Sequence, residues 1–377
     1  MNRPRVPLRK FVKEYSVRNK ANEDIPVYSV TNSQGFCTEY FGKEVASHDK
    51  TTYKIVPRGY FAYNPSRINV GSVDWQRCED RVIVSPLYTV FSVSDEIDCQ
   101  YLYYFLRSDF GKQMIKARAS GSVRDNLKLE MLKEMTIPDI SKEEQHFCAQ
   151  ILDRLQILIQ LRKQELQKLD DLIKARFVEM FGDPRSNPFE FDQRRLKDTC
   201  KVITGNTPSR AVSEYYGDVI EWIKTDNIVS GLINPTKATE FLSEKGMKVG
   251  RIVESDAILM ACIAGSISSI GKVCIANRKV AFNQQINAII PESYDIVFLY
   301  ILFQMSKEYL VEDVNMALKG ILSKSKLEEK EFIVPPMDFQ KEFADFVKKV
   351  NKSKLLEARQ AGFIAKYRPI NIILSIG

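Results

Sequence analysis

Histidine is nearly missing from this sequence, and signatures of several common protein classes are missing with it. Only His48 and His146 occur among the 377 residues, so a histidine-based metal site or a serine–histidine triad has almost nothing to draw on. The seven cysteines include no CxxC pair, which argues against a zinc ribbon and a disulfide framework. No run of ~18 uncharged apolar residues occurs, and the basic start of the chain lacks the apolar core of a signal peptide. We therefore expect a cytoplasmic protein that neither crosses a membrane nor binds a metal.

Motifs for nucleotide and base chemistry are missing as well. The chain has no GxxxxGK[ST] phosphate loop and no Rossmann glycine fingerprint. A methyltransferase pocket for a flipped base would need an Asn/Asp-Pro-Pro-aromatic run, whereas Asn64-Pro65 and Asn187-Pro188 lack the second proline and fit turns. The only candidate for the acid–acid–lysine core of a metal-dependent nuclease is Glu328-Glu329-Lys330. We expect this run to lie in a helix and to face solvent. We predict no catalytic residue and no cofactor in this chain, with a diverged nuclease or methylase kept as an alternative.

The charge of the chain permits a polyanionic partner without identifying one. Lysine and arginine number 55 against 48 acidic residues, a formal net charge of +7. A positive surface favours nucleic acid, because each phosphate that it neutralises releases counterions. The sequence pI of about 8.8 stays below the value of ~9 that marks a strong nucleic-acid footprint.

Four short patterns recur along the chain in the same order and at a nearly constant separation. A length of 377 residues already favours two or three domains. Three of the patterns recur after 197 residues (251 − 54, 299 − 102 and 330 − 133), and the fourth, Gln145 with Gln340, recurs after 195 (340 − 145). One small insertion or deletion explains the series, which favours a duplicated unit over convergent strand–turn–helix patterning. The three 197-residue matches are Lys54-Ile55-Val56 with Arg251-Ile252-Val253, Leu102-Tyr103 with Leu299-Tyr300, and residues 133–138 (KEMTIP) with residues 330–335 (KEFIVP).

Each repeat begins with a β-rich part, here called a head, and ends in a long helix. In the heads, β-branched and aromatic residues punctuated by Gly, Pro and Asn predict strands, with a short helix near residues 98–111. The seven-residue apolar pattern from Lys142 to Phe181 predicts a helix of about 40 residues, which would span roughly 60 Å. Ser141 with Glu144 forms a capping-box start, and Gly182-Asp183-Pro184 forms a stop.

A helix of this length outgrows one domain and needs a partner of similar length, which the second repeat offers from Phe339 onward. We therefore predict an α/β (α+β) fold in which two similar β-rich heads are separated by long antiparallel coiled-coil spacer helices, with pseudo-two-fold symmetry. The predicted boundaries are 1–140 for the first head, 141–183 for the central spacer helix, 184–337 for the second head and 338–377 for the second spacer helix.

Two stretches of the chain resemble a known protein family. The run LQKLDDLIKARFVEMFGDP (residues 166–184) looks like a central spacer helix and its exit. The run ITGNTPSRAVSEYYGDVIEWIKTDNI (residues 203–228) resembles the opening of a recognition domain. With the two junctions at Ile137-Pro138 and Val334-Pro335, the chain resembles the specificity subunit of type I restriction–modification enzymes as far as about Ser353.

This resemblance implies a DNA-recognition subunit without catalytic activity of its own. The two heads would be target recognition domains that each read one half of a split duplex DNA sequence, and the spacer helices would set the gap. Methyltransferase subunits with S-adenosylmethionine and restriction–translocase subunits with ATP and Mg would be separate partner chains. A coiled-coil scaffold whose heads bind protein is the alternative from another class.

Reading DNA requires polar side chains for base edges and cations for phosphates. Arg67 and Arg124 are the strongest candidates, because arginine can pair with both acceptors of guanine. Residues 120–124 (SGSVR) and 319–323 (KGILS) occupy equivalent places just before the two junctions. The candidates in the first head are Asn32, Ser33, Gln34, Asn64, Arg67, Arg118, Ser122 and Arg124. The candidates in the second head are Thr207, Ser209, Arg210, Lys224, Asn227, Ser266, Ser268, Lys319, Ser323 and Lys324.

The first long helix carries an apolar stripe that predicts a partner interface. After Lys354 the chain departs from the charged heptad that the resemblance leads us to expect, and Pro369 would break a helix. We therefore expect the second spacer helix to be truncated or altered there, which would leave residues 165–180 without a partner inside the chain. A methyltransferase subunit or a second copy of the chain would then cover them. The stripe consists of Leu155, Ile159, Leu166, Leu169, Ile173 and Met180.

Overall fold

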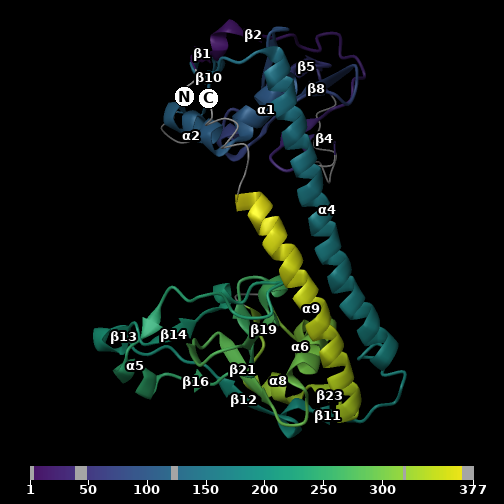
Figure 1. The fold of residues 1–377 in the computed structure, drawn as a ribbon, viewed down its shortest axis with the longest axis vertical. Helices are drawn as coiled ribbons and strands as arrows, with labels where there is room; N and C mark the ends of the chain where they lie inside the picture. The colour runs from purple at the N-terminus through teal and green to yellow at the C-terminus, as the bar shows by residue number, and fades with distance from the viewer. Residues whose placement is uncertain (1–3, 39–48, 120–125, 317–319, 367–377) are drawn as a thin grey trace. The chain divides into compact units, whose positions relative to one another are not determined.

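The computed structural model describes residues 4–38, 49–119, 126–316 and 320–366, with side chains described as far as Leu355. The chain divides into two compact units. The first unit comprises residues 1–164 and 358–377, and the second comprises residues 165–357. Both units mix strands with helices, which agrees with the predicted fold class (Figure 1). In the described part of the chain, no helix combines the length and the apolar character needed to cross a bilayer.

The first unit is built on a small antiparallel sheet. Its strand order is β2-β9-β6-β7, and the central pair places Phe61 opposite Phe91. Both rings are fully buried and stack 5.0 Å apart, and they form a core with the helices. Three two-stranded pairs, β1-β10, β3-β4 and β5-β8, complete the unit. The strands are β1 (Arg5–Pro7), β2 (Val12–Glu14), β3 (Ser29–Thr31), β4 (Gly35–Cys37), β5 (Lys54–Pro57), β6 (Phe61–Tyr63), β7 (Val73–Trp75), β8 (Arg81–Val84), β9 (Thr89–Val93) and β10 (Thr136–Pro138), and the helices are α1 (Cys99–Arg107), α2 (Asp109–Arg118), α3 (Leu129–Lys133) and the start of α4 (Lys142–Phe181).

The second unit repeats this arrangement with additional strands. Its main sheet has the order β12-β21-β17-β19, and all of its pairings are antiparallel. A second, five-stranded sheet has the order β13-β15-β14-β20-β16. The strands are β11 (Gln193–Arg195), β12 (Cys200–Thr204), β13 (Tyr216–Gly217), β14 (Ile220–Ile223), β15 (Phe241–Leu242), β16 (Ile252–Val253), β17 (Ala257–Ala261), β18 (Ile263–Ala264), β19 (Val273–Ala276), β20 (Val280–Phe282), β21 (Ile286–Pro291), β22 (Gly320–Ile321) and β23 (Glu331–Ile333), and the helices are α5 (Glu244–Val249), α6 (Ile296–Met305), α7 (Lys307–Val311), α8 (Lys324–Glu329) and α9 (Met337–Lys366).

The two units are similar folds, because corresponding strands occupy the same positions in their main sheets. β2, β9, β6 and β7 correspond in order to β12, β21, β17 and β19. The first residue of β9 is Thr89 and that of β21 is Ile286, a separation of 197 residues (286 − 89). The three sequence patterns with this separation lie in β5 and β16, in α1 and α6, and around β10 and β23. The repeated patterns therefore mark equivalent structural elements.

Helix α4 has the bounds that the sequence predicts. At its start, the backbone N–H of Glu144 donates to Ser141 Oγ at 3.2 Å, and the N–H of Ser141 donates to Glu144 Oε2 at 3.1 Å. These reciprocal bonds are the predicted capping box. At its end, Gly182 has a φ of +70°, and a Cβ atom added there would lie 2.3 Å from Pro188 Cγ. Only glycine meets both conditions without strain, so the helix stops at Phe181.

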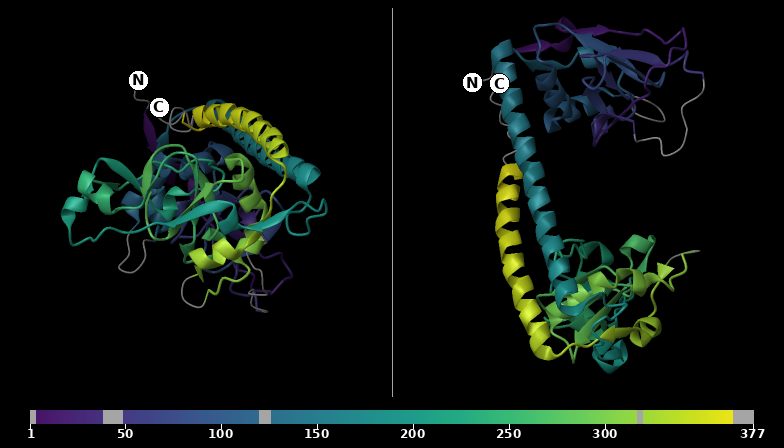
Figure 2. Two further views of the ribbon diagram at one scale, coloured as in Figure 1. Left: turned by 90° about the horizontal axis from the view of Figure 1, so that it is seen from below. Right: turned by 90° about the vertical axis from the view of Figure 1, so that its right-hand side faces the viewer.

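Within the second unit, α4 and α9 lie side by side and antiparallel (Figures 1 and 2). Phe177 packs against Phe343 with ring centres 5.5 Å apart, and Asp170 forms an ion pair with Lys354 further along. Phe177 and Phe343 are fully buried with Phe298 of α6, which lies between the strands and the helix pair. The expectation that residues 165–180 lack a partner inside the chain is therefore wrong. The α9 residues that contact this part of α4, Phe343 and Lys354, lie before the sequence departs from the charged heptad, and α9 itself continues to Lys366.

Exposed apolar side chains occur in both parts of α4, and Leu172 and Val178 in the second-unit part are each 47% exposed. The side chains of the predicted stripe differ in burial: Ile173 is buried, and Leu155, Ile159, Leu166, Leu169 and Met180 are half-buried. By contrast, Phe147, Ile157, Leu158 and Leu161 are exposed by 64%, 57%, 45% and 49%. These four residues, here called the α4 apolar face, all belong to the part of α4 in the first unit.

Candidate nucleic-acid interface

A cavity of about 640 Å³ in the first unit brings together three of the predicted DNA-contacting residues. Asn32 follows β3, and Asn64 and Arg67 follow β6, so the cavity joins segments that are distant in sequence. Nine of its thirteen lining residues are polar or charged, which suits contact with base edges and phosphates. The residues that line it are Ser29, Val30, Thr31, Asn32, Asn64, Pro65, Ser66, Arg67, Val70, Ser72, Leu87, Tyr88 and Asn126.

The turn after β6 orients Asn64 and Arg67. Asn64 Oδ1 accepts hydrogen bonds from the backbone N–H of Ser66 at 3.1 Å and from Ser66 Oγ at 2.9 Å. The backbone N–H of Arg67 donates to the carbonyl oxygen of Asn64 at 3.0 Å, and the N–H of Leu127 donates to Pro65 at 3.0 Å. Because its oxygen is already used, the amide of Asn64 can offer the cavity a donor.

The hairpin of β3 and β4 forms another wall of the cavity, and hydrogen bonds with residues of α1 and β7 stabilise it. Arg107 of α1 donates to the carbonyl oxygen of Asn32 and, at 3.1 Å, to that of Gly71. The buried Asp74 accepts from the backbone N–H of Phe36 at 3.0 Å. Sequence reasoning missed both supporting residues, because only the folded chain brings α1 and β7 against this hairpin. Gln34 lies in the same turn, where its N–H donates to Thr31 Oγ1 at 3.0 Å.

The other predicted residues of the first unit do not line this cavity. Ser33 and Gln34 are neighbours of Asn32 but are not part of the lining. Arg118 ends α2, where its guanidinium donates to the carbonyl oxygen of Met114 at 3.3 Å. Ser122 and Arg124 lie outside the described residues.

In the second unit, Arg210 and Lys224 share one carboxylate next to an aromatic pair. The guanidinium carbon of Arg210 lies 4.4 Å from the ring centre of Tyr216 and 5.1 Å from that of Trp222. Glu240 accepts from Arg210 at 2.6 Å and also pairs with Lys224. The hydrogen bond from Lys224, supported by Arg210, lowers the pKa of Glu240 below its ordinary value, against the opposing effect of burial. The cluster thus holds two cations, each partly neutralised, at the surface.

The predicted residues around this cluster form hydrogen bonds within the protein that stabilise the neighbouring loops. The hydroxyl of Thr207 donates to Gln284 Oε1, and Ser209 is exposed in the same loop. Asn227 is 7% exposed, and its amide bonds to the N–H of Lys224 at 3.0 Å and to Thr236 Oγ1 at 3.2 Å. In this conformation the side chain of Asn227 fixes a loop.

The remaining predicted residues of the second unit lie around the pair β18–β22. Ala264 is opposite Gly320 and Ile263 is opposite Ile321, so Ser266 and Ser323 follow opposite ends of the pair. Ser266 and Ser268 bond to one another at 3.1 Å between their hydroxyl oxygens. Lys324 pairs with Glu328 at 3.5 Å, and Lys319 lies outside the described residues. Ser323 and Ser266 therefore do not lie next to one another in the structure.

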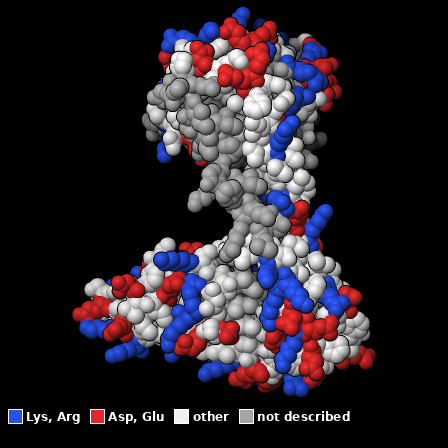
Figure 3. Space-filling model, viewed as in Figure 1, with Lys and Arg blue, Asp and Glu red and all other residues white. Residues whose placement is uncertain are grey.

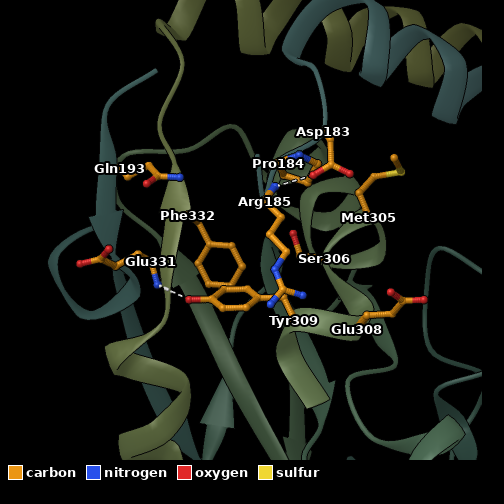
Figure 4. A pocket seen from close by; sticks show the side chains of 10 residues that line it. All are labelled: Asp183, Pro184, Arg185, Gln193, Met305, Ser306, Glu308, Tyr309, Glu331 and Phe332. Atoms are coloured by element: carbon orange, nitrogen blue, oxygen red, sulfur yellow. Dashed lines mark hydrogen bonds between the residues drawn. The ribbon is translucent and has the colours of Figure 1, made fainter. Parts of the chain in front are cut away.

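A second cavity, of about 240 Å³, contains none of the predicted residues (Figure 4). Arg185 and Tyr309 point into it, and the N–H of Glu331 donates to the hydroxyl of Tyr309 at 3.1 Å. Nearby Lys330 is 6% exposed and pairs with Glu312 at 3.2 Å and Asp313 at 3.0 Å. The expectation that Lys330 faces solvent is therefore wrong, because two acidic residues of the α7 end compensate its burial. Among the described residues, no group of three or more His, Cys, Asp and Glu is placed to hold a metal ion.

Basic and acidic side chains are interspersed over the visible face of each unit (Figure 3). The sequence matches the family of type I restriction modification DNA specificity domains twice, over residues 9–171 and 188–361. The chain belongs to this family. Each matched specificity domain includes most of the long helix that follows it, α4 for the first domain and α9 for the second.

Two relatives of the specificity family are similar to most of this chain. The type I restriction enzyme MjaIX specificity subunit of Methanocaldococcus jannaschii is 24% identical over 296 residues, which are 73% of this chain and 67% of that protein. The type I restriction enzyme HindI specificity subunit of Haemophilus influenzae is 25% identical over 279 residues, 70% of this chain and 57% of that protein. The similarity thus spans little more than half the length of the second relative.

Solved structures show that the fold is that of specificity subunits. A chain from a structure concerned with complex assembly and conformational transition of a type I restriction–modification system superposes with a TM-score of 0.61 at 16% identity, covering 100% of this chain and 98% of that chain. The S subunit of the type I system from M. genitalium superposes with a TM-score of 0.56 at 14% identity, covering 99% and 95%. At such identities the likeness establishes the fold.

Proposed function

We propose that this protein is the DNA-specificity subunit of a type I restriction–modification complex and that it catalyses no reaction itself. The observation that carries the proposal is the pair of specificity domains, matched over residues 9–171 and 188–361, with a common strand order in their main sheets. Two similar domains in one chain suit a bipartite duplex target, of which each domain reads one half. The recognition domains would be residues 1–140 and 184–337, and the spacers residues 141–183 and 338–377.

Each domain presents side chains that suit this role. The cavity of the first domain offers the amide of Asn64 and the guanidinium of Arg67, which can donate to acceptors on base edges or phosphates. The second domain offers Arg210 and Lys224 beside Tyr216 and Trp222. The 40-residue helix α4 joins the domains, and its length would set the gap between the two half-sites.

The α4 apolar face would dock a partner. Phe147 and Ile157 are more than half exposed, and Leu158 and Leu161 nearly so. Clustered apolar side chains on a helix surface bind other helices, because burying them removes apolar area from water. We assign this face to the methyltransferase subunit, with a second copy of the chain as the other candidate. S-adenosylmethionine, ATP and Mg would be bound by the methyltransferase and restriction–translocase subunits.

The proposal is tested by mapping methylated bases. The chain is produced in a cell together with its methyltransferase subunit, and the methylated positions of that cell's DNA are determined by single-molecule sequencing. We expect methylation within one interrupted motif, and no such methylation when the chain is omitted. A control that replaces Leu161 with Glu should abolish methylation by preventing assembly while leaving both domains folded. Methylation that does not depend on the chain, or that follows a continuous motif, would disprove the proposal.

A further inference from the structure

The lining of the cavity in the first domain includes a highly exposed leucine that sequence reasoning did not single out. Leu87 is 78% exposed, the highest value among the large apolar residues in the described part of the chain. It sits in the turn between β8 and β9 and lines the cavity with Asn64 and Arg67. A leucine so exposed gains little from folding, and it shares the cavity lining with Asn64, whose amide can donate hydrogen bonds.

The turn that carries Leu87 is held in place on several sides. The N–H of Leu87 approaches Ser85 Oγ at 3.5 Å, and the N–H of Tyr88 donates to the carbonyl oxygen of Ser85 at 3.0 Å. Lys54 Nζ donates to the carbonyl oxygen of Tyr88 at 2.6 Å, and the hydroxyl of Tyr88 accepts from the N–H of Val30 at 3.4 Å. The side chain of Leu87 is therefore presented from a fixed backbone, which limits the entropy lost on binding.

The neighbours of Leu87 restrict the chemistry of that ligand. Asn64 Oδ1 already accepts two hydrogen bonds from Ser66, so the amide offers a donor to the cavity, and a guanidinium such as that of Arg67 carries only donors. The surface thus combines an apolar contact with hydrogen-bond donors. In the major groove, thymine is the base that presents a methyl group next to a hydrogen-bond acceptor, its O4.

The second domain differs at the equivalent turn. The residue corresponding to Leu87 at the 197-residue separation is Gln284 (87 + 197 = 284), just before β21. Gln284 is exposed and accepts a hydrogen bond from Thr207. The apolar contact is therefore particular to the first domain, and the two half-sites would be read by different chemistry at this position.

We propose that Leu87 is a specificity-determining residue that contacts the 5-methyl group of a thymine in the half-site read by the first domain. This inference rests on the proposed function, since it requires that the first domain reads duplex DNA. It assigns to one half of the target a base that the general role of the protein does not specify.

The test uses deoxyuridine, which differs from thymidine only by the missing methyl group. The full chain with its methyltransferase subunit is titrated with a duplex that carries the mapped motif, and each thymine is replaced in turn. We expect one replacement, in one half-site, to weaken binding about fourfold, the equivalent of one buried methyl group. In the variant Leu87→Ala the same replacement should have no further effect, and Leu87→Gln should change the preferred base at that position. Leu232→Ala, which removes another exposed leucine, should behave as wild type.

The outcomes separate this inference from the function on which it rests. If the complex prefers no duplex sequence, both are overturned. If it binds its motif specifically but every deoxyuridine replacement affects wild type and Leu87→Ala equally, or the half-site has no thymine, only the role of Leu87 is overturned. Since Leu87 is exposed, Leu87→Ala should keep the thermal midpoint of wild type, and an unchanged midpoint shows that any loss of binding reflects the missing contact.

Discussion

The side-chain oxygen of Gln340 accepts a hydrogen bond of 2.9 Å from the backbone N–H of Asp295, which joins the first turn of α9 to the start of α6. The same contact occurs in the first unit, where Gln145 Oε1 accepts from the N–H of Asp98 at 2.8 Å. The amide nitrogens of the two glutamines donate to carbonyl oxygens of the chain that enters each long helix, Pro335 and Ile140. Each glutamine therefore links the start of a long helix to the domain that precedes it through hydrogen bonds.

Replacing Gln340 with Ala should destabilise the second unit by about 2 kcal/mol, because the N–H of Asp295 and the carbonyl oxygen of Pro335 would be left without this partner in a buried place. Gln340 is 1% exposed. The measurement is the free energy of unfolding in urea. Gln167→Ala, which changes an exposed glutamine of α4, is the control and should have little effect. Equal effects of the two substitutions would show that the hydrogen bonds of Gln340 do not stabilise the second unit.

The exit of α4 depends on Gly182 for two separable reasons. Gly182 has a φ of +70° and a crowded Cβ position, whereas Gly231 has a φ of +85° with no atom within 4 Å of its Cβ position. Gly231→Ala should therefore cost about 1 kcal/mol of backbone strain, and Gly182→Ala should cost clearly more. Thermal unfolding of both variants measures the difference. Equal shifts of the midpoint would show that Pro188 moves away without cost.

The cluster around Glu240 should make the stability of the second unit depend on pH. Because Lys224 and Arg210 lower the pKa of Glu240 in the folded state, the stabilisation is present above the ordinary glutamate pKa and is lost as the pH falls through the folded value. Between about pH 6 and about pH 3, the thermal midpoint of wild type should therefore fall further than that of Glu240→Gln. Parallel curves for the two proteins would show that the ion pairs do not contribute.

Arg67→Ala should weaken recognition at one half-site only, by about 1–3 kcal/mol if the guanidinium contacts a base. The residue lines the cavity of the first domain with Asn64. Binding is measured on duplexes that change one base at a time, at two salt concentrations. Arg210→Ala in the second domain is the matched comparison and should affect the other half-site. A uniform loss on all sequences, with a reduced dependence on salt, would indicate phosphate contact instead.

Features set by local sequence could be predicted from the chain alone. The bounds of α4 follow from Ser141, Glu144 and Gly182, because capping and a left-handed stop involve only neighbouring residues. The equivalence of Gln145 and Gln340 also appears in the sequence, since both copies keep the same short-range pattern. The bonds that these glutamines make join parts of the chain 47 and 45 residues apart, and no sequence pattern indicates them.

Features that depend on packing were decided only by the tertiary structure. Residues 165–180 are covered because Phe343 of α9 packs against Phe177, a contact that a missing heptad after Lys354 does not affect. Asn227 looked like a base-reading residue, yet its amide is used within its own loop. Asn32, Asn64 and Leu87 share a cavity because β3, β6 and the β8–β9 turn converge there. Local patterns determine where helices and repeats begin and end, whereas long-range burial determines which side chains meet, because apolar area and hydrogen-bond partners are shared across the whole fold.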